Sequence, residues 1–151
     1  MAIEILIKST EINPPDHHML IEAIQNTLDA EGKSNADITL KLTGDKEMRR
    51  LNWTYRQIDH TTDVLSFNQD YVDPETGRVY LGDIIISLEQ AQKQAEENHR
   101  SLREECARLA IHGTLHLLGY DHAEPEEEAA MWELQESLVS NVLRSLQEGY
   151  E

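Results

Sequence analysis

The stretch RVYLGDIIIS, residues 78–87, is the clearest β-strand in the sequence, and its IIIS end is apolar enough to be buried on both faces. The segment DPETG at 73–77 precedes it and has the composition of a turn. On the other side of that turn, DVLSF at 63–67 is a shorter strand candidate. The sequence therefore contains a buried strand around which the other elements can be placed.

Two capping boxes follow this strand toward the C-terminus. Ser87 pairs with Gln90 and Ser101 pairs with Glu104, each at the spacing in which a hydroxyl and a side chain three positions later satisfy free backbone groups at a helix start. They predict two consecutive helices over roughly 88–99 and 102–118.

The rest of the chain alternates strands and helices. Strands are expected at 2–7 and 36–42, a helix from Asn13-Pro14-Pro15 to Gly32, a second helix from Gly44 and Asp45, and a last helix from Pro125 with the stripe Met131, Leu134, Leu138, Val142 and Leu146. The order βαβαββααα predicts one α+β domain over residues 1–151, with a mixed sheet of about four strands packed with about five helices.

Composition narrows the class of protein. The chain has 29 acidic against 13 basic residues, which argues against broad, non-specific attraction to nucleic acid. No apolar run approaches the roughly 20 residues of a membrane span, and the N-terminal residues lack the order of a signal peptide. With Cys106 alone, no disulfide can form within the chain. We expect a cytoplasmic protein that does not associate with membranes.

The stretch HGTLHLLGYDH, 112–122, holds three of the seven histidines. His112 and His116 are four apart, so both rings leave the same face of a helix that is otherwise apolar almost all round. Burying unpartnered imidazole nitrogens costs free energy, and one metal ion would satisfy both rings. Gly119 can end the helix in a left-handed conformation, and His122 can then approach from the following loop. Three neutral nitrogens with an open position are the layout of a catalytic zinc site.

Other interpretations of the histidines have less support. A single histidine on such a helix would usually be a hydrogen-bonded core residue, and a structural zinc site usually has four ligands rich in cysteine. Cys106 points about 120° away from His112 on an ideal helix and is more simply a small core residue. Three imidazoles favour zinc, nickel or copper over magnesium. The expected cofactor is one Zn²⁺, with Ni²⁺ as an alternative.

Gly113 bears on the chemistry of the site. The histidine spacing parallels the metzincin signature H-E-x-x-H-x-x-G-x-x-H, in which the glutamate is the general base, but Gly113 has no side chain for that role. A peptidase is therefore disfavoured. A substrate that supplies its own nucleophile or proton acceptor would suit the site, and RNA has both in its 2′-hydroxyl and phosphate oxygens.

Three separated motifs resemble one known family. HGTLHLLGYDH resembles the H-G-x-L-H-L-x-G-[YH]-D-H signature of the YbeY family of metal-dependent endoribonucleases, which act in rRNA maturation. NWTYRQIDHTTDVLSF at 52–67 and LGDIIIS at 81–87 resemble two further family motifs. The resemblance covers essentially the whole chain.

The resemblance implies a function and a set of site residues. It implies a zinc-dependent endoribonuclease specific for single-stranded RNA, acting near the 3′ end of small-subunit rRNA and in ribosome quality control, with the ribosome or ribosome-assembly proteins as partners. His112, His116 and His122 would hold the zinc, and Arg56 would face it across the cleft as the catalytic contact to RNA. The alternatives are a metallopeptidase-like hydrolase and a non-catalytic assembly factor whose zinc stabilises the fold.

The remaining candidates concern charge. A nuclease with a formal charge of −16 must concentrate cations near its cleft. Lys46, Arg49 and Arg50 lie on the same short helix as Arg56 and are candidates for substrate binding. Further candidates are Arg103 and Arg108 for this cationic strip, and Asp63, Asp83 and Asp121, which we expect to bond backbone at turns, with orientation of a ligand histidine as the minority alternative.

Overall fold

A computed structural model describes residues 3–7, 12–121 and 123–149, the last four of them by their backbone only. The elements are β1 (Ile3–Ile7), α1 (His17–Ala30), β2 (Ala36–Thr43), α2 (Asp45–Arg56), β3 (Val64–Val72), β4 (Val79–Ser87), α3 (Leu88–Glu97), α4 (Leu102–Leu117) and α5 (Pro125–Gly149). The predicted α+β class and the predicted order of elements are confirmed.

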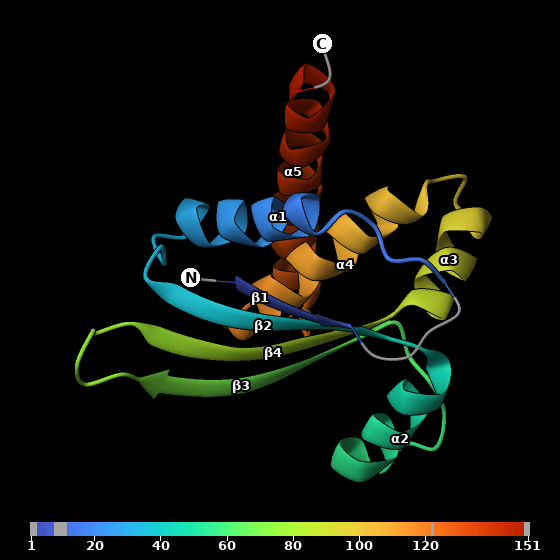
Figure 1. The fold of residues 1–151 in the computed structure, drawn as a ribbon, viewed down its shortest axis with the longest axis horizontal. Coiled ribbons are helices and arrows are strands. Elements are labelled where there is room, and N and C mark those ends of the chain that lie inside the picture. The colour runs from blue at the N-terminus through green and yellow to red at the C-terminus, as the bar shows by residue number, and fades with distance from the viewer. Residues whose placement is uncertain (1–2, 8–11, 122, 150–151) are drawn as a thin grey trace.

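The four strands form one mixed sheet in the order β1-β2-β4-β3. β2 pairs in parallel with both β1 and β4, whereas β3 and β4 form an antiparallel hairpin. Helices α1, α4 and α5 lie over one face of this sheet, and α2 lies on the other (Figure 1). The sheet therefore separates α2 from the three helices on the opposite face.

Strand β4 is buried on both faces, as its sequence predicts. Ile84 and Ile86 belong to the main hydrophobic core beneath α1, α4 and α5. Ile85 points the other way because side chains alternate along a strand, and it joins a second cluster. That second cluster consists of Met48, Leu51, Leu65 and Ile85, with Phe67 packed against it. The main core packs α1, α4 and α5 against the sheet, and the second cluster packs α2 against its opposite face.

Two element boundaries differ from the sequence prediction. Strand β3 runs on to Val72 because it stays paired with β4 beyond the point where burial ends, so its exposed half has no apolar alternation. Helix α1 begins at His17 rather than at the prolines, because the Asp16 carboxylate accepts a hydrogen bond from the His18 amide and caps the helix there. Neither difference changes the topology.

Other predicted features can be placed directly. Cys106 is fully buried in the main core, and burial raises the pKa of its thiol to about 12. His122 lies outside the described residues, as does the side chain of Leu146. Among the helices that the structure describes, none combines the length and the apolar character that crossing a membrane requires.

Candidate active site

The centre of the site is the partly exposed face of α4 that carries His112 and His116. Most of this helix is buried, but the side chains of His112 and His116 are only partly so, and they stand one turn apart on the same face. Their Nε2 atoms are 3.0 Å apart, and the two rings meet nearly edge to face. Two imidazole nitrogens thus converge on one point.

The other side of the His112 ring contacts α5. Its Nδ1 lies 2.7 Å from the Gln135 Oε1, and Gln135 is only 4% exposed. Sequence reasoning missed this residue because it belongs to no motif. One signal was available: among the described side chains of α5, Gln135 is the amide on a buried stripe that otherwise consists of Met131, Leu138, Val139 and Val142.

A cavity of about 480 Å³ opens beside the two histidines. It is lined by Arg56, Asp63, Val64, Ser66, Asn68, His112, His116 and Asp121. These side chains come from α2, the start of β3 and the residue before it, α4 and the loop that follows α4, so elements from both faces of the sheet line the cavity. Its lining is mostly polar, which suits a charged ligand better than an apolar one.

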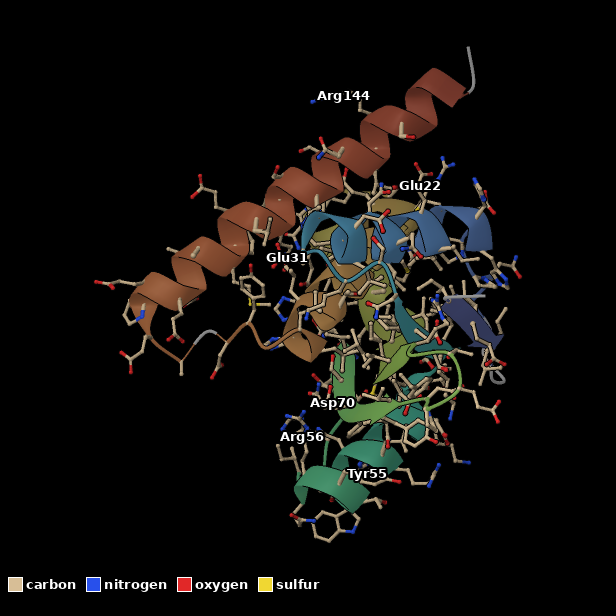
Figure 2. The ribbon with its side chains drawn as sticks, turned by 90° about the vertical axis from the view of Figure 1, so that its left-hand side faces the viewer. Glu22, Glu31, Tyr55, Arg56, Asp70 and Arg144 are labelled. Atoms are coloured by element: carbon tan, nitrogen blue, oxygen red, sulfur yellow. The ribbon has the colours of Figure 1, made fainter. Side chains whose placement is uncertain are left out.

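Helix α2 brings Arg56 to this cavity. Gln57 ends the helix in the left-handed conformation, and the buried Asn52 amide donates to the His60 carbonyl at 2.9 Å, which fixes the chain after the helix. Arg56 projects from this end of α2 on the same side of the molecule as the α4–α5 connection (Figure 2). Within the described part of the chain, its guanidinium makes no ion pair and no side-chain hydrogen bond. It is therefore available to an anionic ligand.

Strand β3 contributes Ser66 and Asn68 to the cavity lining, and both side chains are hydrogen-bonded to α4. The Ser66 hydroxyl donates to the Gly113 carbonyl at 3.3 Å, and the Asn68 amide donates to the Leu117 carbonyl at 2.9 Å. A β-carbon added at Gly113 would lie 2.7 Å from Cγ2 of Ile84, closer than such contacts normally come. Glycine at this position lets α4 pack directly on the sheet.

The loop after α4 turns back toward the cavity. Gly119 has a φ of 102°, as its sequence position predicts, and the Tyr120 amide closes the helix by donating to the Leu115 carbonyl. The Tyr120 hydroxyl donates to Glu31 at the end of α1, which ties the loop to the main body. Asp121 then lines the cavity. The described residues, which do not include His122, contain no group of three His, Cys, Asp or Glu side chains placed to hold a metal ion.

The predicted cationic strip lies mostly away from this cavity. Arg49 pairs with Asp59 at 2.9 Å, and Arg50 pairs with Glu47 at 2.9 Å. Lys46 and Arg49 instead line a separate cavity with Asp59, His60 and Thr61. None of these three residues lines the histidine cavity, so their contact with substrate stays a prediction.

The suggestion that Arg108 extends the strip is wrong. Arg108 is only 9% exposed, and its guanidinium bonds the carboxylates of Glu104 and Glu136 between α4 and α5. It holds the two helices together and does not face solvent. Arg103 is partly buried on the same helix.

The aspartates divide by location. Asp63 lines the cavity, but its oxygens accept from the Val64 amide and the Gln94 side chain, so it acts in the architecture of the strand start. Asp83 lies on the opposite face of the sheet and accepts from the Tyr80 hydroxyl. Within the described residues, neither aspartate is bonded to a histidine. Gln135 instead contacts the Nδ1 of His112.

Comparison with known proteins places the chain among relatives that share one name. The family model described as Endoribonuclease YbeY matches residues 3–143. Endoribonuclease YbeY of Heliobacterium modesticaldum is 46% identical over 71% of this chain and 70% of its own length. The Persephonella marina protein of the same name is 44% identical over 80% of each chain.

Similarity also extends over nearly the full length. Endoribonuclease YbeY of Streptococcus suis is 32% identical over 93% of this chain and 96% of its own. The solution structure of TM1509 from Thermotoga maritima superposes with a TM-score of 0.63 and 26% identity, covering 97% of this chain and 93% of that one. Family model, relatives and fold agree, and the chain belongs to the YbeY endoribonuclease family.

Proposed function

We propose that the protein is a zinc-dependent endoribonuclease that cleaves single-stranded RNA during the maturation of ribosomal RNA. The observation that supports this best is that two converging imidazole nitrogens and the guanidinium of Arg56 line the same polar cavity. The proposal includes the 3′ end of small-subunit rRNA as the physiological target, the ribosome or its assembly proteins as partners, and a cytoplasmic location.

The residues present fit a zinc ion. Bonds from zinc to histidine nitrogen are about 2.0–2.1 Å long, so two nitrogens on one ion lie no more than about 4 Å apart. The 3.0 Å between the Nε2 atoms of His112 and His116 satisfies this limit. His122 is the third expected ligand, by the sequence motif alone. Zinc held by three histidines acts as a Lewis acid and lowers the pKa of water at an open position.

Arg56 supplies the contact to the phosphodiester. A guanidinium is a planar fork that can donate two parallel hydrogen bonds to phosphate oxygens. At the cavity wall it would orient the phosphate toward the histidines and stabilise the negative charge that grows on phosphorus during cleavage. The acidic composition of the chain makes such a focused contact more important than general attraction.

The first test compares zinc-loaded wild-type protein with Arg56→Ala on an unstructured RNA and on a hairpin of the same length. We expect wild type to cut the unstructured RNA and the variant to lose about 10²–10³-fold in cleavage rate, the range measured for removal of one transition-state donor. Arg144→Ala is the matched control, because Arg144 lies far from Arg56 on α5 (Figure 2). Equal rates for Arg56→Ala and Arg144→Ala would contradict the assignment.

Two further arms address the alternative functions. Proteolysis of casein that disappears in His116→Ala, with RNA left intact, would establish a peptidase instead. A strain carrying only Arg56→Ala should accumulate incompletely processed small-subunit rRNA. A normal rRNA profile in that strain, together with strong thermal stabilisation by zinc, would favour a non-catalytic assembly factor.

A further inference from the structure

A chain of polar contacts links His112 to the ion pair that joins α4 and α5. Arg108 binds both oxygens of Glu136, at 2.9 Å from Nε and 2.5 Å from Nη2. The Gln135 amide nitrogen lies 3.4 Å from Glu136 Oε2, and its amide oxygen lies 2.7 Å from Nδ1 of His112. Four side chains from two helices thus form one continuous series.

The chemistry of the series fixes the orientation of the Gln135 amide. The Arg108 guanidinium holds the pKa of Glu136 below its ordinary value, so this carboxylate only accepts hydrogen bonds. The NH₂ group of Gln135 must therefore face Glu136. The amide oxygen consequently faces His112, and an oxygen of this kind has no proton to give.

The orientation of the amide decides the protonation of the ring. A neutral imidazole has one N–H donor and one nitrogen with a free lone pair. Because Nδ1 faces an acceptor, Nδ1 carries the proton and Nε2 of His112 keeps its lone pair. That nitrogen is the one that lies 3.0 Å from His116.

Burial supports a specific role for the amide. Gln135 is 4% exposed on a stripe of apolar side chains, where leucine or methionine would avoid the cost of burying polar atoms. Among the described residues, the amide has its hydrogen-bond partners in His112 and Glu136. Packing alone gives no reason for a glutamine here.

We propose that Gln135 is a positioning residue that holds His112 in its Nδ1–H tautomer and directs the Nε2 lone pair to a metal ion beside His116. The metal part of this proposal rests on the proposed function, whereas the tautomer does not. Hydrogen-bond partners behind a ligand histidine typically account for 10–100-fold in metal affinity.

The first measurement concerns the metal-free full-length protein. Long-range ¹H–¹⁵N spectra of ¹⁵N-histidine-labelled protein at about pH 8.5, above the ordinary range of histidine titration, report the tautomer of each ring. His112, assigned by its loss in a His112→Ala sample, should be the Nδ1–H form in wild type. In Gln135→Met, which keeps the volume and removes the acceptor, the Nε2–H form should gain population.

The second measurement is zinc affinity, by competition with a chromophoric chelator. We expect Gln135→Met to bind Zn²⁺ about 10–100-fold more weakly than wild type. Leu138→Met is the matched control, since Leu138 is a buried α5 residue that takes no part in the polar series, and it should bind as wild type does.

The outcomes separate the two proposals. If Gln135→Met keeps both the wild-type tautomer and the wild-type affinity, the role of Gln135 is refuted. If wild type binds no zinc but Gln135→Met changes the tautomer, the metal site is refuted and the positioning role stands. An equal loss of affinity in Gln135→Met and Leu138→Met would reduce the effect to packing and overturn the inference.

Discussion

At Gly113, the lack of a side chain affects both the packing of α4 and the chemistry of the site. The residue lies where α4 rests on β4, and an added β-carbon would meet Cγ2 of Ile84 at 2.7 Å and Oγ of Ser66 at 3.2 Å. The larger glutamate of zinc peptidases would require α4 to lift off the sheet. The difference between this site and a peptidase site is therefore built into the core.

Gly113→Ala should destabilise the fold despite the better helix propensity of alanine. Overpacking a core typically costs about 1–3 kcal/mol, while the propensity gain is about 1 kcal/mol, so we expect a net loss of up to about 2 kcal/mol. Urea denaturation of the metal-free protein measures it. Ser137→Ala, at an exposed position of α5, serves as the control. If Gly113→Ala is as stable as this control, the Ile84 side chain can move to make room for the added β-carbon.

At the scale of the element, α2 is attached by a small number of contacts. Its apolar face contributes Met48 and Leu51 to the second cluster, and Tyr55 packs against Phe67 with ring centroids 5.0 Å apart. Glu47 adds a polar link, because its carboxylate binds Arg50 on the same helix and Lys41 on β2. The link to β2 fixes the helix that carries Arg56.

The Glu47 link should weaken in acid. Hydrogen bonds from Arg50 and then Lys41 lower the pKa of Glu47 from 4.5 to about 2. A carboxylate whose folded pKa is depressed contributes stability that is fully present above its unfolded pKa and is lost as the pH falls through the folded pKa. The contribution should therefore be complete above about pH 4.5 and disappear toward pH 2.

Glu47→Gln tests this expectation. The variant should be less stable than wild type by on the order of 1 kcal/mol at neutral pH, after solvent screening of a partly exposed pair, and the gap should close below pH 4.5. Urea denaturation across the acid range measures the gap, with Glu133→Gln on the exposed face of α5 as control. A gap that stays constant with pH would mean that Glu47 acts through shape rather than charge.

The sequence predicted the elements well because each carries a local signal. Apolar periodicity, two capping boxes and the glycine at 119 all act within a few residues. The exposed half of β3 has no such signal, because only its pairing with β4 keeps it extended. Patterns within a few residues therefore predict the order of the helices and strands, but they do not predict where an exposed strand ends.

The site was only partly predictable for the same reason. His112 and His116 are four residues apart and follow from helix geometry. Gln135 reaches His112 across 23 positions and two helices, a contact that depends on how α5 lies on α4. Arg56 came from the family resemblance, since by pattern alone it is an ordinary helix-end residue; its position at the cavity depends on α2 docking beneath the sheet.

At the scale of the whole molecule, charge limits how RNA can bind. The chain carries a formal charge of −16, and two of the arginines proposed for substrate binding already pair with acids. Affinity for single-stranded RNA falls with salt with a slope of about −0.7 for each phosphate neutralised. With Arg56 at the cavity wall and at most two further cations of α2 near it, we expect a slope between about −0.7 and −2.

Arg56→Gln should reduce the steepness of this slope by about 0.7, because one phosphate contact is removed. The binding is measured in a His116→Ala background, so that the RNA stays intact, and Arg144→Gln serves as control. A slope near −4 or steeper in wild type would instead require an extended basic surface that includes Lys46, Arg49 and Arg50.

The sheet divides the hydrophobic interior in two, and each wall of the cavity is anchored in a different part. The histidine wall belongs to the main core, and the Arg56 wall belongs to the second cluster. Substitutions among Met48, Leu51 and Phe67 should therefore change the width and tilt of the opening while the helix that carries the two histidines keeps its position on the sheet. The geometry of the opening is therefore set by a few side chains that are separate from the main core.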